Sequence, residues 1–281
     1  MLFPHPERPV YFKRARLAAA SLLLAASSLA HAGKVLYVTH EPGRWHDYSA
    51  QLADFREVAA DASWELTVAT GDKDALFDFL RSENFAAGQD AIVYNFCLAD
   101  SRDMAAMSNL IDQTVSGGVP AVLVHCAMHS WWDTFKKGKP IPGNPLDKAR
   151  ASKSLLKQWQ QDHPNETMPA WGDFTGIAST KHGPKKPITL VAIAESPVAL
   201  NIPDGYATRK TELYNNHYLT PDVVPLLRGI QRNNEEVVMW LAPRGEGQII
   251  GLTLGHNDDE WDDPVFRELL KSAVDYLLEP Q

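Results

Sequence analysis

The sequence predicts an α/β fold in which an open, mostly parallel sheet carries helices on both faces. Two observations predict this fold class. Apolar runs alternate with amphipathic segments from residue 34 to residue 124, and an amphipathic pattern at 264–278 closes the chain. A strand–helix–strand rhythm is typical of βαβ units, whose strands run parallel.

Each expected element follows from its local pattern. Short apolar runs indicate strands, and apolar side chains at helical spacing, such as Met104, Met107 and Leu110, indicate helices. Gly117-Gly118 ends the helix that contains these three residues. The expected strands are 34–40, 64–69, 90–96, 120–124, 188–194, 235–242 and 248–254, and the expected helices are 49–60, 75–80, 101–115, 146–161 and 264–278.

The middle of the chain has a different character. Residues 136–145 are rich in Lys, Gly and Pro, which indicates a loop, and residues 171–186 show almost no periodicity. The second segment is expected to pass over the rim of the sheet. Long irregular loops inside compact domains usually serve function, so this second segment is a candidate to border a site.

The first 32 residues have the pattern of a secretory signal peptide. A basic region that ends at Arg16 precedes an apolar run at 17–29, and Ala30-His31-Ala32 provides a small-residue cleavage site. The sequence therefore predicts a periplasmic or secreted protein cleaved near Ala32, with residues 33–281 as a single domain. The apolar run is shorter than the roughly 20 residues of a spanning helix, so no stable membrane insertion is expected after cleavage.

Length and charge narrow the function classes. Removal of 32 residues from the 281 of the chain leaves 249, a length that suits one large α/β domain. The whole chain has a formal net charge of −8, and loss of the four basic residues and one acidic residue of the leader makes it −11. An acidic protein repels phosphate backbones, so nucleic acid is not an expected partner.

Histidines and cysteines gather at the ends of the expected strands. His40 closes the first strand, Cys97 the third, His125-Cys126 the fourth and His256 the last, while His46 follows the first strand within a loop. Ligands of open α/β sheets bind outside the carboxyl ends of the strands. Several imidazoles at one rim need mutual hydrogen bonds, a metal or a substrate, so the pattern predicts a functional site there.

Cys126 leaves three interpretations open. It could be a nucleophile with His256 as its base, a small buried thiol that packs the strand end, or one half of a disulfide with Cys97. The strained elbow of nucleophile enzymes needs small residues two places on either side, where this sequence has Val124 and Met128. The buried thiol is therefore favoured over a cysteine-dependent amide hydrolase.

His125 and His129 raise the alternative of a metal. Imidazoles four residues apart lie on one face of a helix and could share a divalent ion. Zinc takes three or four ligands, and the candidates for the third are Glu212, His182, His217 and His256. No cofactor is required by the sequence, and histidines that act as general acid and base are the favoured interpretation.

A set of ordered motifs runs through nearly the whole mature chain. They are Trp45-His46, the GGVPAVLVH run that ends at His125, His182-Gly183-Pro184, Glu212-Leu213-Tyr214, Val238-Met239-Trp240, the GQIIG run that ends at Gly251, and Leu254-Gly255-His256. In this order the chain resembles the ThuA-like (trehalose-utilisation) proteins. The resemblance implies the flavodoxin-like, class I glutamine amidotransferase-like fold.

The resemblance also implies a site and a chemistry. It implies a pocket lined by His46, His125, Glu212 and His256, which form the expected catalytic set. The candidate substrate contacts near the same segments are Trp45, His129, Trp131, His182 and Tyr214, with Trp132 and Trp261 as further aromatic candidates. ThuA-like proteins are associated with trehalose and with 3-keto sugars made by partner oxidoreductases. The family position of Cys126 is commonly a small, non-nucleophilic residue, so the fold does not bring the amidotransferase mechanism with it.

Two functions of different classes follow from this resemblance. The first is an enzyme that isomerises or hydrolyses oxidised disaccharides or glycosides, in which Glu212 takes a proton beside the ketone and His125 or His256 polarises the oxygen. The second is a non-catalytic carbohydrate-binding protein. Retention of the candidate His and Glu side chains favours the enzyme. The expected ligand is a small sugar, and a sugar oxidoreductase of the same pathway is a candidate partner.

Overall fold

A computed structural model describes residues 32–99, 101–131, 138–144, 146, 148–193 and 196–279. From Ala32 onward these residues belong to one compact unit. Apart from Ala32, the expected leader lies outside the described residues, and so does Trp132. No helix among the described residues is long and apolar enough to cross a membrane.

The main sheet has eight strands in the part of the chain that the structure describes, in the order β2-β1-β3-β4-β12-β11-β10-β8. The strands from β2 to β12 in this order pair parallel, and β11, β10 and β8 extend the sheet antiparallel. The mostly parallel open sheet is confirmed. The strands are β1 Lys34–Val38, β2 Glu65–Ala69, β3 Ala91–Tyr94, β4 Ala121–Val124, β8 Thr189–Ala192, β10 Val224–Gln231, β11 Asn234–Arg244 and β12 Gly247–Leu252.

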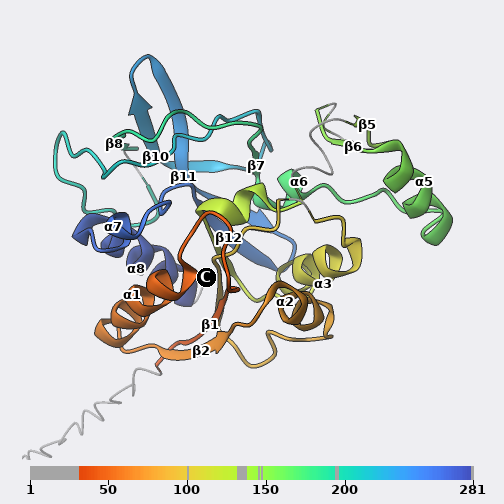
Figure 1. The fold of residues 1–281 in the computed structure, drawn as a ribbon, viewed down its shortest axis with the longest axis horizontal. Helices are drawn as coiled ribbons and strands as arrows, with labels where there is room; N and C mark the ends of the chain where they lie inside the picture. The colour runs from red at the N-terminus through yellow and green to blue at the C-terminus, as the bar shows by residue number, and fades with distance from the viewer. Residues whose placement is uncertain are drawn as a thin grey trace, which may run out of the picture. The chain divides into compact units, whose positions relative to one another are not determined.

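Helices cover both faces of the parallel part (Figure 1). Side chains alternate across a strand, so Val35 and Tyr37 of β1 pack with α1 and α8, while Leu36 and Val38 pack with α2 and α3. The sheet is therefore buried on both sides, as the apolar strand sequences require. The helices are α1 Tyr48–Asp61, α2 Lys73–Arg81, α3 Met104–Val115, α5 Lys153–Asp162, α6 Trp171–Thr175, α7 Asp258–Trp261 and α8 Pro264–Leu278.

Aspartate caps explain where four of these helices begin. The side chains of Asp47, Asp72, Asp103 and Asp263 each accept a backbone N–H of the first turn of α1, α2, α3 and α8, respectively. Such a cap satisfies an amide that has no partner inside the helix. Pro264 adds a residue whose fixed φ suits the first helical position. These helices lie where the sequence predicts them, within three residues at the ends.

The second half of the chain differs more from expectation. Strand β10 was not expected, and the expected helix 146–161 begins later, because Ser152 caps α5 at Lys153. The segment 171–186, expected to be irregular, contains the short helix α6 and strand β7, Ile177–Ala178, which pairs with β9, Tyr218–Leu219. Elements of two to five residues are too short to show a periodic pattern in the sequence.

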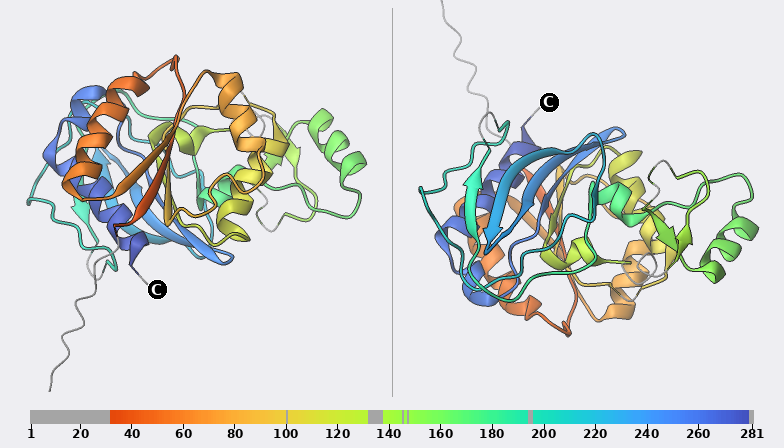
Figure 2. Two further views of the ribbon diagram at one scale, coloured as in Figure 1. Left: turned by 90° about the horizontal axis from the view of Figure 1, so that it is seen from below. Right: turned by 90° about the horizontal axis from the view of Figure 1, so that it is seen from above.

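The segment from β5, Lys139–Pro140, through β6, Arg150–Ala151, to α5 projects from one side of the sheet (Figure 2). It has its own small apolar cluster, in which Ile141, Ala149, Ala151, Met168 and Ala170 are buried. Helix α5 itself buries no residue fully. The segment is thus an addition to the α/β core, and it borders a second pocket described below.

Candidate functional site

The carboxyl ends of β1, β3, β4 and β12 lie at one edge of the sheet, because these strands are parallel. His46 lies in the loop after β1, Cys97 follows β3, His125 follows β4 and His256 follows β12. From β1 the chain adds β2 on one side of the sheet and β3 on the other, so the strand order changes direction between β1 and β3. Open α/β sheets bind ligands at this position. The structure therefore brings these predicted residues to one place.

His125 lies at the centre of this cluster. It is 1% exposed and begins the 3₁₀-helix η1, His125–His129, directly after β4, with a positive φ of 44°. Its Nδ1 lies 2.7 Å from the carbonyl oxygen of Thr253. Because a carbonyl can only accept, Nδ1 carries the hydrogen, and Nε2 of the neutral ring presents a lone pair. That Nε2 lies 2.9 Å from His256 Nδ1 and 3.0 Å from the Tyr214 hydroxyl.

His46 and His256 complete a group of three imidazoles. His46 Nδ1 donates to the backbone oxygen of His256 at 3.0 Å, and its ring meets His125 and His256 edge to face, with ring centroids 5.1 and 4.8 Å apart. The backbone N–H of His256 donates to the carboxylate of Glu260 at 2.8 Å. The first bond fixes the tautomer of His46, and the last holds the backbone that carries the His256 ring.

Glu212 reaches the imidazoles from the opposite side of the site. Its segment is held by paired backbone hydrogen bonds between Thr211 and Lys186. One carboxylate oxygen of Glu212 lies 3.5 Å from His256 Nδ1 and 3.9 Å from His125 Nε2, and the other lies 3.5 Å from His182 Nδ1. Glu212 is only 6% exposed, so these nitrogen atoms form much of its surroundings.

Burial sets the charge state of the cluster. Desolvation lowers the pKa of His46 and holds the pKa of His125 well below the ordinary value, in both cases more than any neighbouring charge does. For His256, desolvation and then the neighbouring His46 lower the pKa to about 3. Desolvation raises the pKa of Glu212, against the opposing influence of His182 and Lys185. At neutral pH the three imidazoles are therefore uncharged beside a carboxylate of increased basicity.

A cavity of about 400 Å³ opens over the cluster. Trp45, 64% exposed, stands at its rim, and the Arg44 guanidinium lies 4.7 Å from the Trp45 ring centre. The lining combines aromatic, basic and acidic side chains: Trp45, His46, Cys97, Ala99, Cys126, His129, His182, Lys185, Glu212, Tyr214 and His256. Such a mixture suits a polar ligand with apolar ring faces, such as a sugar.

The predicted substrate contacts have different outcomes. Trp45, His129, His182 and Tyr214 line the cavity, and the His129 ring stacks on Tyr214 at 4.0 Å between ring centres. Trp131 does not line it: this side chain is fully buried in the core and donates its indole N–H to the Asp103 carbonyl at 2.9 Å. The expectation that Trp131 contacts substrate was wrong, since strand-end position does not reveal side-chain direction.

Two further aromatic candidates also fall away from the cavity. Trp261 is fully buried and donates to the Gly255 carbonyl at 3.0 Å, which supports the loop that carries His256. Trp132 lies outside the described residues. Of the four tryptophans considered as sugar-stacking residues, Trp45 alone is placed at the cavity among those described.

Cys97 and Cys126 form a disulfide between the ends of β3 and β4. The favoured interpretation of Cys126 as a buried free thiol was therefore wrong. With its sulfur bonded to Cys97, Cys126 has no thiolate to act as a nucleophile, and the cysteine-dependent amide hydrolase loses its basis in this oxidised form. The sequence allowed the disulfide because the two strands are neighbours, but it did not show that the two Cβ atoms face each other.

The groups that could hold a metal differ from the expected pair. Among the described residues, two sets of three donor atoms lie within 4.8 Å of one another: His46, His125 and His256, and His46, Cys97 and Cys126. His129 belongs to neither set, so the structure does not pair it with His125 as ligands of one ion. The reason is that η1 is a short 3₁₀-helix, in which residues four apart do not share a face.

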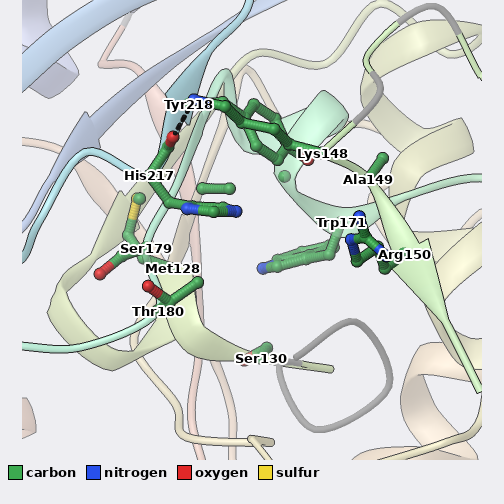
Figure 3. Close-up of a pocket in the computed structure, with 12 residues that line it drawn as sticks. Met128, Ser130, Lys148, Ala149, Arg150, Trp171, Ser179, Thr180, His217 and Tyr218 are labelled. Carbon is green, nitrogen blue, oxygen red and sulfur yellow. Dashed lines mark hydrogen bonds between the residues drawn. The ribbon is translucent and has the colours of Figure 1, made fainter. Parts of the chain in front are cut away.

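A second pocket, of about 310 Å³, is lined in part by Met128 of η1 and by Ser130 directly after it (Figure 3). Lys148, Arg150 and His217 contribute basic groups to it, and Trp171 and Tyr218 contribute aromatic rings. Lys148 donates to the His217 backbone oxygen at 3.0 Å, the hydrogen bond drawn in Figure 3. His217, one of the possible metal ligands considered from the sequence, is thus placed away from the three imidazoles.

Sequence reasoning missed three contributors to the site. Glu260 fixes the His256 backbone, and burial raises the pKa of its carboxyl to about 7. Thr253 sets the tautomer of His125 through a main-chain oxygen, which no residue pattern encodes. Lys185 lines the cavity and lies in the segment 171–186, whose irregularity was the available signal.

Comparison with known proteins agrees with this fold. Residues 34–277 match the family model ThuA, described as trehalose utilisation. A ThuA-like protein from Bacteroides uniformis is 15% identical, with a TM-score of 0.58 over 90% of this chain and 94% of the other, and one from Parabacteroides merdae is 12% identical, with a TM-score of 0.59 over 87% and 90%. A search of curated proteins found no match.

A solved structure of the glutamine amidotransferase class also has a similar fold. A GMP synthase protein from Thermoplasma acidophilum is 10% identical, with a TM-score of 0.50 over 88% of this chain and 95% of that one. The glutamine amidotransferase-like fold predicted from the sequence is therefore confirmed. At identities this low the similarity concerns the fold and not the activity. Because the family model covers nearly the whole described unit, the chain belongs to the ThuA (trehalose utilisation) family.

Proposed function

We propose that this protein is an enzyme that acts on an oxidised sugar, a 3-keto disaccharide or glycoside, by moving a proton on the carbon beside the ketone. The observation that carries the proposal is the Glu212 carboxylate, buried between His256 and His182 in a cavity of sugar size. Isomerisation begins with this proton transfer, and cleavage of the glycosidic bond by elimination begins with it too.

Glu212 is the group best suited to remove that proton. A ketone makes the adjacent C–H acidic, and a base works best when its pKa approaches the working pH. Burial raises the pKa of Glu212, and its neighbours His125 and His256 are uncharged. The carboxylate is thus a stronger base than an exposed glutamate and is not held in a full ion pair by these two rings.

The oxygen of the ketone needs a partner as its negative charge grows. Nε2 of neutral His125 has no hydrogen to give, because Thr253 accepts the hydrogen of Nδ1. The expected role of His125 is therefore to orient His256 and Tyr214, whose hydrogen atoms it accepts. The Tyr214 hydroxyl has a single hydrogen, which His125 accepts, so the Lys185 ammonium at the cavity is the protein group available to polarise the oxygen.

Hydrogen exchange tests the proposal most directly. The purified protein is incubated with 3-keto-trehalose or a 3-keto-glucoside in D₂O, and deuterium at the carbon beside the ketone is followed by NMR. The wild type is expected to exchange this hydrogen and to turn the sugar over, and Glu212→Gln to lose at least about 100-fold in both, the range of general-base catalysis. Glu166→Gln, on an exposed loop, is the matched control and should keep full activity.

The result also decides between the two functions that the sequence allows. A wild-type protein that binds these sugars but neither exchanges nor converts them is a carbohydrate-binding protein, and the enzyme proposal is then wrong. A positive result implies an oxidoreductase that makes the keto sugar upstream.

We further propose that residues 1–32 are removed on export. N-terminal sequencing of protein from a periplasmic extract should begin at Gly33.

A further inference from the structure

We propose that His46, His125 and His256 bind one divalent metal ion of the zinc type at the floor of the cavity. All three side chains are buried, with exposures of 9%, 1% and 5%, and their donor atoms lie within 4.8 Å of one another. Three imidazoles from segments that follow three separate strands converge here. Convergence on a single point is what a shared ion requires.

The tautomers of His46 and His125 favour such an ion. The carbonyl oxygens of His256 and Thr253 accept from Nδ1 of these two rings, at 3.0 and 2.7 Å. Each ring consequently presents an unprotonated Nε2. Histidine ligands of metals almost always donate their other N–H to a carbonyl or carboxylate, because this bond orients the ring and increases the basicity of the ligand atom. Both histidines have this outer bond in place.

The donor atoms are near enough to one another to share an ion. His125 Nε2 and His256 Nδ1 are 2.9 Å apart, and the donor atom of His46 lies within 4.8 Å of both. Ligands at roughly 2.0–2.1 Å from zinc stand about 3.3 Å apart at the corners of a tetrahedron. The ion would replace the hydrogen shared by His125 and His256, and the hydrogen of His256 would move to its Nε2. No net proton is released in this exchange.

The fourth position of the ion would face the cavity, which His46, Glu212 and His256 line. Three protein imidazoles with one open position form the ligand set of catalytic zinc rather than of closed structural zinc. This part of the inference rests on the proposed function: the ion would polarise the ketone oxygen that His125 cannot reach with a hydrogen, while Glu212 takes the proton. Metal binding itself does not depend on which substrate is used.

A second set of donor atoms meets the same distance criterion as the first. His46, Cys97 and Cys126 also lie within 4.8 Å, but the two sulfur atoms are bonded to each other. A thiolate is the form that binds metal, so this set is closed while the disulfide exists. The two sets can be separated by experiment, because they share only His46.

The test measures metal content and coordination directly. Untagged protein is stripped with a chelator, dialysed against Zn²⁺ or Co²⁺ and then against metal-free buffer, and its metal is measured by elemental analysis and by the visible absorption of Co²⁺. One ion per chain and the intense bands of four-coordinate Co²⁺ are expected. Loss of an outer hydrogen-bond partner typically costs 10–100-fold in affinity, so His46→Ala, His125→Ala and His256→Ala should each lose more than about 100-fold.

Three controls make the result specific. His163→Ala, at the end of α5, and His217→Ala, in the second pocket, should keep one ion per chain. A Cys97→Ser/Cys126→Ser variant should also keep it, and loss of the ion there would overturn the three-histidine assignment in favour of the thiol set. Circular dichroism of each variant shows whether it is folded, and Glu212→Gln, which keeps all three imidazoles, should retain the Co²⁺ bands.

Failure of this inference and of the proposed function can be told apart. Wild-type protein that binds no ion in excess Zn²⁺ or Co²⁺, or whose binding is unchanged in all three histidine variants, overturns the metal site. One bound ion without turnover of any 3-keto sugar supports the metal site and overturns the substrate proposal. Full turnover of a 3-keto sugar by metal-free protein supports the substrate proposal and overturns the catalytic role of the ion.

Discussion

His125 holds its position at the cost of a strained backbone conformation. Its φ of 44° lies in the left-handed region, which costs a residue with a Cβ about 1–2 kcal/mol. This conformation turns the chain sharply after β4 and directs the imidazole toward Thr253 and His256. Strain of this kind persists where the surrounding structure fixes it, and it is frequent in functional sites.

The strain predicts an inverted order of stability for two variants of His125. Glycine normally destabilises relative to alanine, but at a positive φ it relieves the cost of the Cβ. Neither His125→Gly nor His125→Ala keeps the imidazole, and we expect the free energy of unfolding of the glycine variant to be about 1 kcal/mol higher. Urea denaturation of both variants measures the difference, and an alanine variant as stable as the glycine variant would show that the backbone is not strained.

Gly251 on β12 is fixed by its contact with Trp240 on β11. A Cβ at residue 251 would lie 2.0 Å from Cζ2 of the fully buried Trp240 ring. Overpacking of this kind typically costs 1–3 kcal/mol, so Gly251→Ala should lower the free energy of unfolding by about 3 kcal/mol. In a Trp240→Phe background the clashing atoms are absent, and the same change should cost about 1 kcal/mol. Equal costs in the two backgrounds would contradict the proposed contact.

At the residue scale, the sequence predicted the membership of the site better than its geometry. His46, His125 and His256 could be grouped because parallel strands end at one edge, while Glu212 was one of several possible metal ligands until the family resemblance placed it in the catalytic set. The direction of each side chain was beyond reach, which is why Trp131 was misplaced and the Cys97–Cys126 disulfide was not favoured. Direction depends on the two or three dihedral angles after each strand, and those angles are set by long-range contacts.

At the element scale, helix α6 links the antiparallel strands to the site. Trp171 of α6 donates its indole N–H to the Ala127 carbonyl of η1 at 2.9 Å. The other end of α6 is held by β11, where Trp240 donates to the Thr175 carbonyl and Arg244 donates to the Phe174 carbonyl. The position of η1, and with it His125, therefore depends in part on strand β11.

Arg244 tests this link between elements. Its guanidinium donates to Phe174, Asp222 and Thr220 at 2.6, 2.7 and 3.1 Å, while the side chain is largely buried. Lysine cannot reach three acceptors in a plane, and the buried Phe174 carbonyl left unpaired costs about 1–3 kcal/mol, while Asp222 is about half exposed and can bond water instead. We expect Arg244→Lys to lower the free energy of unfolding by about 2 kcal/mol.

The matched control for Arg244 is Arg228 on β10. It also pairs with a carboxylate, Glu235 at 2.6 Å, but both side chains are about half exposed. Exposed pairs contribute about 0–1 kcal/mol, so Arg228→Lys should change stability by less than about 1 kcal/mol in the same denaturation experiment. Similar losses in the two variants would mean that the buried fork of Arg244 has no special role.

Elements were predictable where one local pattern was long enough to decide. Helix α8 agrees at both ends with the expected 264–278, since a proline at its start and an apolar stripe both mark it. Strand β10 was missed because Pro225 and Gly229 interrupt its apolar pattern. It forms nevertheless, because its neighbours β11 and β8 both supply hydrogen-bond partners. Pairing of this kind is a tertiary effect that overrides local preference.

At the scale of the whole molecule, the predicted fold class held because layers follow from burial alone. Strands that are apolar on both sides need helices on both faces, and the parallel half of the sheet has them. The site forms where four segments far apart in sequence meet at the strand ends, so its integrity reports on the whole fold. A ligand that joins these segments should therefore stabilise the entire unit against unfolding.

Metal titration predicts the size of that effect. A ligand that binds only the folded state adds about 2.7 kcal/mol at 100 times its Kd, and 1 kcal/mol shifts the Tm of a unit of this size by about 2–4 °C. Zn²⁺ at this excess should therefore raise the Tm of the wild type by about 5–10 °C in differential scanning calorimetry, and a chelator should reverse the shift. His125→Ala should show no shift, because it lacks one of the three imidazoles that bind the ion. His163→Ala keeps all three and should respond like the wild type. An equal shift in His125→Ala would place the stabilising ion elsewhere in the molecule.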